Sequence, residues 1–560
     1  MHRSSRLTAV LAAACVIAVG VAACGSSGSS SSSSKSSGGG GGKEGGTATV
    51  LMGTAPDFLD PGQGYTTQSA EATWLTYVGL LSYKHAAGQA GTQLIPGLAE
   101  ALPQISKDGK TYKLKLRKGL VFSNGKPVKA SDFASTVERT VKANWGGKSF
   151  ITSYVEGAAD FDKGKAKSIS GITTDDATGD ITIKLATAYG AFGNVLAFPA
   201  VGLLPKGTPP KNLSNNPPPG VGPYMITDVK PNRTFTLVKN PKFAGLKIPD
   251  VPVGHLDKIV VNITSNTQSE AQQVLNDQAD AFDAGDTLPP ALLPQIQSKA
   301  KDRYKKQTVP STFYFFLNTQ IKPFNNELAR QAVNYAIDRQ AMVRLASGFL
   351  KPACFFLPEG IPGHPTGACP HGSLDKPDLA KAKALVQQSG MAGEKITVWG
   401  EERSPRKQYV EYYASVLNKI GFKATPKIIA DSVYFPTVGN AKTKAQTGFG
   451  DWIQDFPNPS DFYLLLDGKA IQPLNNSNLS NVNDPKIQDA LGKLNPVPAT
   501  ELTRVAKQWE DLDRYAAEKA YQVVYGSEQA PQFFGSKLDF ASAIFHPLYF
   551  NDWSSWQLKQ

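Results

Sequence analysis

A short segment in the C-terminal half of the chain combines aromatic rings, carboxylates and prolines. Residues 450–462 read GDWIQDFPNPSDF. Pro457 and Pro459 disfavour a helix, which predicts a shaped loop. A ring such as Trp452 or Phe456 beside a carboxylate such as Asp455 suits a cationic, partly apolar ligand, because the carboxylate pairs with an ammonium while the ring covers apolar surface. An ordinary loop with surface acids has the same composition and is the alternative.

Motifs that would indicate catalysis are missing from the sequence. It contains neither the G-x-S-x-G turn of serine hydrolases nor the H-E-x-x-H helix of zinc proteases. Gly147, Lys148 and Ser149 match the end of a phosphate-binding loop, but Lys142 stands where that loop needs its first glycine. The six histidines are scattered along the chain. We therefore expect a binding protein rather than an enzyme or an exported hydrolase, and no cofactor.

The N-terminus has the layout of an export signal. Arg3 and Arg6 precede an apolar run over residues 7–23, which is short for a membrane span. The run ends in VAAC at Cys24, which resembles the bacterial lipobox, in which the cysteine becomes acylated. We expect a signal peptide over 1–23 and a lipid on Cys24 that anchors the protein at the extracytoplasmic face of the cell membrane. A plain signal peptide with an incidental cysteine is the alternative.

Composition separates a tether from a globular body. Residues 24–46 are nearly all Ser and Gly, which predicts a flexible tether because such a stretch has little apolar surface to bury. A chain of 560 residues exceeds what one core usually serves, so two or three domains are expected. The net charge is +12, but Lys and Arg are scattered among Asp and Glu. This pattern indicates a solvated surface and no nucleic-acid partner.

Two of the four cysteines lie outside the N-terminal region. Cys354 and Cys369 enclose a segment rich in Pro and Gly, and an isolated pair in an exported protein predicts a disulfide. Closing this loop would stabilise the fold by roughly 3 kcal/mol. The alternative is a zinc site formed by the two cysteines together with His364 and His371, although no C-x-x-C pair supports it.

Short β-rich runs alternate with helical patterns along the body, which indicates an α/β fold. In one run, Tyr112 and Leu114 alternate with Lys113 and Lys115, as in a strand with one exposed face. Helices are expected over 327–345, 405–421 and from 500 onward, and strands over 47–52, 112–117, 181–185, 235–239, 258–263, 313–317, 396–399 and 522–525.

Many motifs occur in the order typical of one protein family. The most specific block is DGKTYKLKLRKGLVFSNGKPV at 108–128, which is followed by ASDF at 130–133. On these blocks the chain resembles the dipeptide- and oligopeptide-binding lipoproteins of ABC importers, bacterial extracellular solute-binding protein family 5, over nearly the whole body. Further matching blocks are FLDP at 58–61, LIPGLAE at 94–100, GPY at 222–224, KNP at 239–241, LNT at 317–319 and RQAVNYAIDR at 330–339.

The resemblance implies a bilobal α/β fold of the large periplasmic-binding-protein type, with a hinge between two lobes. It places lobe one at 47–311, with an added α/β subdomain at about 90–200, lobe two at 312–525, and a return to lobe one over 526–560. It also implies a monomer that captures a peptide or peptide-like solute in the cleft between the lobes. The partners would be an ABC permease and its ATPase.

The resemblance further assigns ligand-contacting residues. In peptide-binding members, an aspartate three residues after a tryptophan receives the free ammonium of the ligand, and the matching position is Asp455, with Trp452 before it. Dipeptide binders also place an arginine against the ligand carboxylate, and both Arg403 and Arg406 fall near that position. Family members also bind nickel chelates and sugars, and a ligand-sensing lipoprotein of the same fold is a further alternative.

Overall fold

The computed structural model describes residues 42–560, which form one compact unit. The expected signal peptide, Cys24 and the expected tether as far as residue 41 lie outside the described residues. Within the described part of the chain, no helix is both long enough and apolar enough to cross a membrane.

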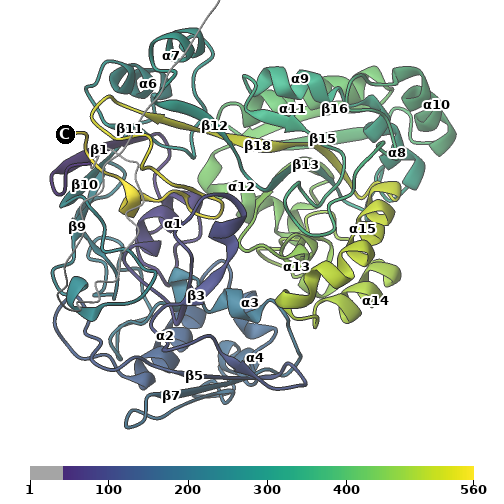
Figure 1. Ribbon diagram of the computed structural model, residues 1–560. Helices are drawn as coiled ribbons and strands as arrows, with labels where there is room; N and C mark the ends of the chain where they lie inside the picture. The colour runs from purple at the N-terminus through teal and green to yellow at the C-terminus, as the bar shows by residue number, and fades with distance from the viewer. Residues whose placement is uncertain (1–41) are drawn as a thin grey trace, which may run out of the picture. The chain divides into compact units, whose positions relative to one another are not determined.

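The largest sheet mixes parallel and antiparallel strand pairs. Its twelve strands, in the order in which they pair, are β16 (Lys423–Ile429), β15 (Lys395–Glu401), β17 (Thr447–Ile453), β13 (Ser311–Leu317), β18 (Gln522–Phe534), β11 (Ala281–Phe282), β1 (Thr47–Met52), β10 (Lys258–Ile263), β9 (Thr234–Lys239) and β8 (Tyr224–Lys230), with β12 (Tyr304–Thr308) and β14 (Leu350–Pro352) paired to β18 beside this path. The strand predicted over 522–525 is thus the start of a thirteen-residue strand, β18. Together with the covering helices, this sheet confirms the α/β class (Figure 1).

Three smaller sheets complete the strands that the structure describes. The four-stranded one is antiparallel and contains β5 (Thr111–Lys115). In β5, Tyr112 and Leu114 are buried while Lys113 and Lys115 are exposed, as the alternation predicts. The sheets are β4 (Gln104–Ile105), β5 (Thr111–Lys115), β7 (Asp180–Lys184) and β6 (Ile172–Thr174); β2 (Leu81–Tyr83) and β3 (Leu94–Pro96); and β19 (Phe545–His546) and β20 (Phe550–Asn551).

The prediction of one helix over 327–345 is wrong in one respect, because two shorter helices occupy this range in the structure. The side chain of Asn326 accepts hydrogen bonds from the backbone of Leu328 and Ala329 and starts the first helix. Ile337 is extended, and the Asp338 side chain then caps the second helix. The α-helices are α1 (Thr67–Trp74), α2 (Ala130–Lys142), α3 (Ser149–Thr152), α4 (Ala158–Asp162), α5 (Phe192–Val195), α6 (Thr267–Leu275), α7 (Leu293–Lys299), α8 (Glu327–Ala336), α9 (Arg339–Leu345), α10 (Leu379–Ser389), α11 (Arg406–Lys419), α12 (Asp431–Val438), α13 (Pro459–Tyr463), α14 (Pro485–Leu494) and α15 (Leu502–Glu518).

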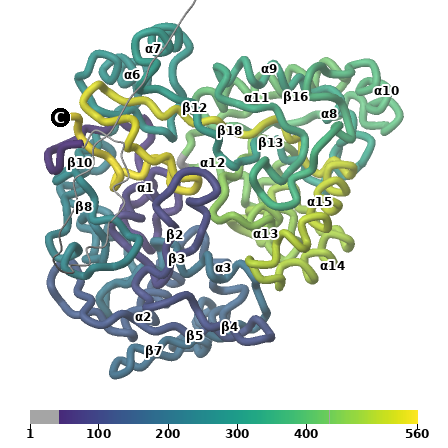
Figure 2. The backbone as a smooth tube through the Cα atoms, in the orientation of Figure 1, coloured from purple at the N-terminus to yellow at the C-terminus, as the bar shows by residue number. Residues whose placement is uncertain are grey.

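The buried apolar side chains form two large cores. The first core draws mainly on residues 48–261 and on the C-terminal residues 534–556, and the second core draws on residues 313–525. The strand β18 contributes Val523 to the second core and Phe534 to the first. The C-terminal segment returns beside the N-terminal strand, where Lys43 N donates to Leu558 O at 2.7 Å (Figure 2). The strand β18 thus links the two cores, while the returning chain end belongs to the first core.

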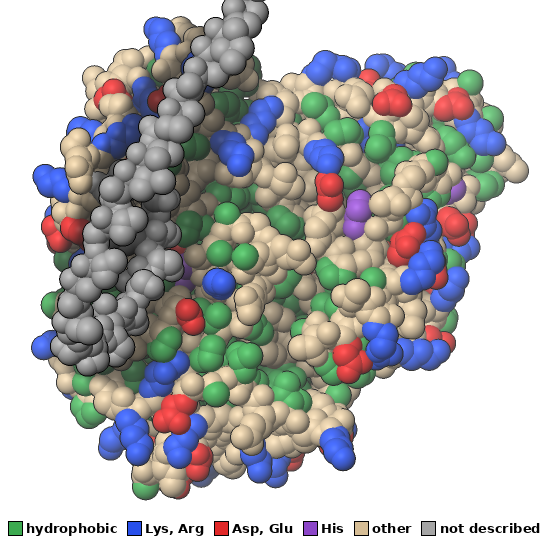
Figure 3. Space-filling model, viewed as in Figure 1, with side chains coloured by type: hydrophobic (Ala, Val, Ile, Leu, Met, Phe, Trp, Pro, Cys, Tyr) green, Lys and Arg blue, Asp and Glu red, His purple; other side chains and the backbone are tan. Residues whose placement is uncertain are grey.

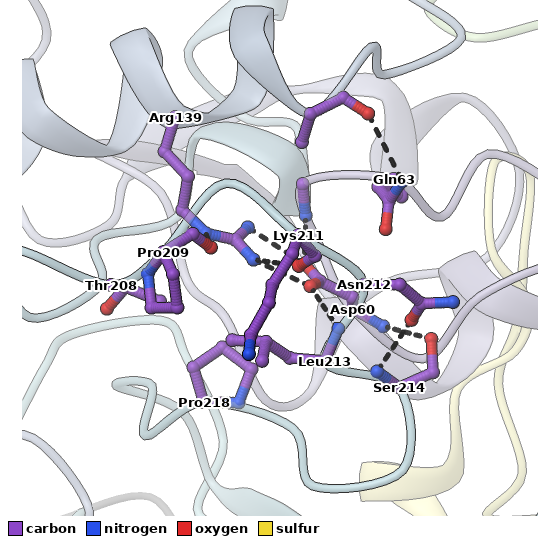
Figure 4. Close-up of polar contacts among 12 residues, drawn as sticks. Asp60, Gln63, Arg139, Thr208, Pro209, Lys211, Asn212, Leu213, Ser214 and Pro218 are labelled. Atoms are coloured by element: carbon purple, nitrogen blue, oxygen red, sulfur yellow. Dashed lines mark hydrogen bonds and ion pairs between the residues drawn. The ribbon is translucent and has the colours of Figure 1, made fainter.

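A buried ion pair explains why the FLDP block at 58–61 is a structural motif. The carboxylate of Asp60 is fully buried and accepts hydrogen bonds from Arg139 Nη1 at 2.9 Å and Nη2 at 2.6 Å. The Leu213 N–H donates to the same carboxylate at 2.9 Å, and Arg139 Nε donates to Pro209 O at 2.9 Å. Figure 4 shows Arg139 and the loop over 208–214 converging on Asp60. The pair thus ties the turn at Asp60, helix α2 and this loop together.

Surface charges of both signs are mixed. On the face drawn in Figure 3, the described Lys and Arg side chains alternate with Asp and Glu around the rim and do not form a single basic stripe.

Candidate functional site

A cavity of about 530 Å³ lies between the two cores. Trp145 and Phe198 line it from the first core, and Tyr314 and Leu465 line it from the second. Small-molecule sites have volumes of roughly 300–1,000 Å³ and combine apolar walls with a few polar groups. The charged side chains in the wall of this cavity are Asp57, Arg403, Arg406, Asp451, Asp455 and Glu528.

Asp455 lines the cavity without a cationic partner from the described protein. The Tyr65 hydroxyl donates a hydrogen bond to Asp455 Oδ2, and the Asp455 N–H donates to Asp461 Oδ2 at 2.8 Å, so both its side chain and its backbone are held. Burial raises the pKa of Asp455 to about 7, although the hydrogen bond from Tyr65 acts to lower it. A cation from a ligand would favour the charged form of this carboxylate.

The segment over 450–462 is not one continuous loop. Trp452 belongs to strand β17, which runs to Ile453, and helix α13 begins at Pro459 after the Asn458 cap. A proline is tolerated at the first position of a helix, so only residues 454–458 form the predicted loop. Trp452 lines the cavity, and its indole Nε1 donates to Asp461 Oδ1 at 3.2 Å. Asp461 therefore orients both Trp452 and the backbone of Asp455.

Phe456 lies elsewhere than expected. Its side chain is fully buried, and its ring centroid lies 5.3 Å from that of Phe150 and 6.2 Å from that of Phe198. Phe456 is not part of the cavity wall. Because neighbouring rings of the first core enclose it, its contribution is packing beneath the site rather than contact with a ligand.

The two arginines that the sequence leaves open have different surroundings. Arg406 Nη1 donates to Glu401 Oε1 at 2.5 Å and its Nη2 donates to Asp451 Oδ2 at 2.7 Å. Burial lowers the pKa of Arg406, but Asp451 and Glu401 more than offset this effect and raise its pKa overall. Arg403 has no carboxylate within ion-pair distance among the described residues, and its guanidinium makes one hydrogen bond, to Thr54 Oγ1 at 3.4 Å. Burial lowers the pKa of Arg403, since no carboxylate of the described residues is close enough to form an ion pair that would offset this effect. Of the two arginines, Arg403 is therefore the one whose guanidinium has hydrogen-bond donors without a partner among the described residues.

Cys354 and Cys369 form the disulfide that the sequence predicts, with their Cα atoms 5.8 Å apart. Both sulfurs are therefore unavailable as thiolate ligands for zinc. A ring nitrogen of His364 bonds to Leu357 O and one of His371 bonds to Glu518 O, each at 2.7 Å. Over residues 42–560, no group of His, Cys, Asp and Glu side chains is arranged to hold a metal ion.

A serine, a histidine and an aspartate lie together in the wall of another cavity. His85 Nδ1 lies 2.7 Å from Asp552 Oδ2 and 3.3 Å from Ser554 Oγ, and Ser554 Oγ donates to Asp552 Oδ1 at 2.5 Å. A nucleophile relay needs the serine and the aspartate on opposite ring nitrogens. Because both contact the same nitrogen here, this cluster is not arranged as a relay.

Sequence reasoning missed several cavity residues. Tyr65 and Trp145 lie more than 300 residues before Asp455, and Tyr549 and Glu528 lie beyond it, so only the fold brings them together. Glu528 did leave a signal, because it is a charged residue within the otherwise largely buried strand β18. The aromatic residues carry no such signal, since isolated rings are also common in cores.

Asp455 is expected to make the ligand-free protein less stable as the pH rises. Its pKa is about 7 in the folded chain against an ordinary value of 3.8, so the folded state keeps a proton that the unfolded chain has already lost. This contribution to stability is fully present below about pH 4 and is lost as the pH rises through about 7. Thermal unfolding between about pH 4.5 and pH 8 tests it, and the melting temperature of Asp455→Asn should fall less than that of the wild type. Equal falls would contradict this assignment.

Comparisons with known proteins agree with this architecture. The family model for bacterial extracellular solute-binding proteins, family 5 Middle, matches residues 93–473. The dipeptide-binding protein DppE of Bacillus subtilis (strain 168) is 27% identical over 306 residues, which cover 52% of this chain and 53% of DppE. The glutathione-binding protein GsiB of Escherichia coli (strain K12) is 29% identical over 334 residues, covering 57% of this chain and 58% of GsiB. The matched part is thus little more than half the length of these relatives.

Similarity of structure extends further along the chain. The clavulanic acid biosynthesis oligopeptide binding protein 2 superimposes with a TM-score of 0.83 at 21% identity, covering 92% of this chain and 96% of that one. At this identity the likeness concerns the fold, which is the bilobal α/β fold expected from the sequence. The family model alone matches more than half of the chain. The chain therefore belongs to the bacterial extracellular solute-binding proteins of family 5.

Proposed function

We propose that this protein is the solute-binding component of an ABC importer and that it captures short peptides with free termini. The ligand lies in the cavity between the two cores, with its ammonium on Asp455 and its carboxylate on Arg403. The names of DppE and GsiB, a dipeptide-binding and a glutathione-binding protein, support a peptide or peptide-like solute. Binding, without chemical turnover, is the activity we assign.

One observation carries this proposal. Within residues 42–560, Asp455 has no cation and Arg403 has no carboxylate at ion-pair distance, and both line the same cavity, whereas the adjacent Arg406 is fully paired. Burying an unpaired charge is costly, and a zwitterionic ligand offsets the cost at both positions at once. The aromatic side chains Trp452 and Tyr65 would cover the apolar part of the ligand.

The remaining expectations complete the proposed mode of action. Lobe one would comprise 47–311, with the subdomain at about 90–200, lobe two 312–525, and the return segment 526–560. The strand β18 crosses the boundary at 525 and 526, so we place the hinge there. A lipid on Cys24 would hold the monomeric protein at the extracytoplasmic face of the membrane, close to a permease and ATPase that receive the ligand from the closed form.

Asp455→Asn is expected to weaken binding of peptides with a free amine by about 30-fold, or ~2 kcal/mol, because a charge-assisted hydrogen bond is lost. Calorimetry with trialanine and N-acetyl-trialanine measures this effect, and the acetylated peptide should lose little further affinity in the variant. Asp511→Asn, which changes an exposed acid on α15, serves as the control. If both peptides weakened equally in Asp455→Asn, the ammonium role of Asp455 would be wrong.

A further inference from the structure

Glu528 is a second carboxylate in the cavity wall, and the backbone around it is fixed. Its N–H donates to Ser311 Oγ at 2.8 Å, and its carbonyl accepts from Val309 N at 3.2 Å. The residue also pairs with Leu350 of β14. The strand that carries Glu528 is therefore held on both edges, and its side chain enters the cavity from a rigid support.

The other charges of the wall already have partners, within the protein or in the proposed ligand. Asp451 is bound by Arg406, and Asp57 accepts hydrogen bonds from backbone and hydroxyl groups of its own segment. Asp455 and Arg403 are assigned to the two termini of the ligand. No Lys, Arg or His among residues 42–560 lies within ion-pair distance of Glu528, and none donates a hydrogen bond to its side chain. Glu528 is thus the carboxylate that remains unmatched when a neutral zwitterion fills the site.

We propose that Glu528 is a specificity-determining residue that binds a cationic side chain of the ligand, so that the preferred substrates are short peptides containing Lys or Arg. This inference rests on the proposed peptide-binding function. A charge-assisted hydrogen bond inside the cavity would fix the ammonium or guanidinium of that side chain, and the rings of Tyr314 and Tyr549 in the wall offer apolar surface for its methylene groups.

The electrostatic surroundings of Glu528 give the preference a pH dependence. Arg403 faces it from the segment before α11, Arg406 and Tyr409 from α11, Asp451 from β17, and Asp286 from the segment after β11. Burial raises the pKa of Glu528 to about 7, because the arginines only partly offset it. Since a cationic side chain binds the ionised carboxylate, the preference for basic peptides should strengthen as the pH rises from about 6 to about 8.

Calorimetry with a peptide series tests this assignment. Each position of trialanine is replaced in turn by lysine or by its uncharged analogue norleucine, and both sets are titrated into wild type and Glu528→Gln. At one position or more, the wild type should bind the lysine peptide about 10- to 100-fold more tightly than the norleucine peptide. In Glu528→Gln this ratio should fall to near one, because glutamine cannot form an ion pair with the lysine ammonium. Glu359→Gln, which changes an exposed acid outside the cavity wall, should keep the wild-type ratio.

Each contrary outcome has a distinct meaning. If the wild type does not prefer lysine at any position, or if the preference persists in Glu528→Gln, the role of Glu528 is overturned while peptide binding stands. If none of the peptides binds the wild type, the proposed function fails and the inference fails with it. The pH series on the wild type needs no variant, and a lysine preference that weakens from pH 6 to pH 8 would also overturn the assignment.

Discussion

Replacing Asp60 with Asn is expected to lower the free energy of unfolding by about 3–5 kcal/mol, because it leaves the guanidinium of Arg139 buried without a counter-charge. Both side chains are almost completely buried, and Arg139 binds the two oxygens of Asp60 in a fork. Asparagine keeps one acceptor oxygen where Asp60 has two, so the hydrogen bonds to Oδ1 and those to Oδ2, which include the one from Leu213, cannot all be kept. Urea denaturation of the purified protein measures the loss.

Two further variants separate the ion pair from simple charge removal. Asp511→Asn removes an acid of the same type from an exposed pair on α15 and should change stability little or not at all. A double-mutant cycle with Arg139→Met isolates the interaction of the pair, and we expect the double variant to be more stable than the sum of the single losses predicts. Additive losses would show that Asp60 and Arg139 act independently.

The sequence predicted those features of this protein that depend on local chemistry. The export signal expected from the sequence implied an oxidising compartment, and on that expectation Cys354 was paired with Cys369, as the structure shows. Alternation of apolar residues predicted a strand over 112–117, and β5 spans Thr111–Lys115, within two residues at each end. The break between α8 and α9 was missed, although Asp338 is a residue type that commonly caps a helix, because the apolar pattern continues across it.

The candidate site was predictable only in part, since it is assembled from distant segments. The motif around Asp455 and the nearby Arg403 and Arg406 could be named, but whether an arginine is paired depends on Asp451, which is 45 residues away from Arg406. Phe456 shows the opposite error. Its ring, next to a carboxylate that lines the cavity, lies in the core instead, which residue type alone does not reveal.

Arg406→Met and Arg403→Met are expected to give opposite results, although the two arginines are three positions apart. Arg406 bridges Glu401 and Asp451, so its loss leaves two buried carboxylates without a cation and should destabilise the protein by about 3–5 kcal/mol. Arg403 pairs with no carboxylate of the described protein, and burial lowers its pKa. Arg403→Met should therefore leave the ligand-free protein as stable as the wild type or make it more stable. Urea denaturation of both variants measures this difference.

Arg403→Met should instead show its effect in ligand binding, through recognition of the ligand carboxylate. The wild type is expected to bind trialanine at least about tenfold more tightly than trialanine amide, because only the free acid offers Arg403 a carboxylate. Arg403→Met should lose this preference while keeping the discrimination between free and acetylated amines that Asp455 provides. If Arg403→Met kept the preference for the free acid, or destabilised the empty protein as much as Arg406→Met, then the protein itself would satisfy Arg403, and the ligand carboxylate would have to bind elsewhere in the cavity.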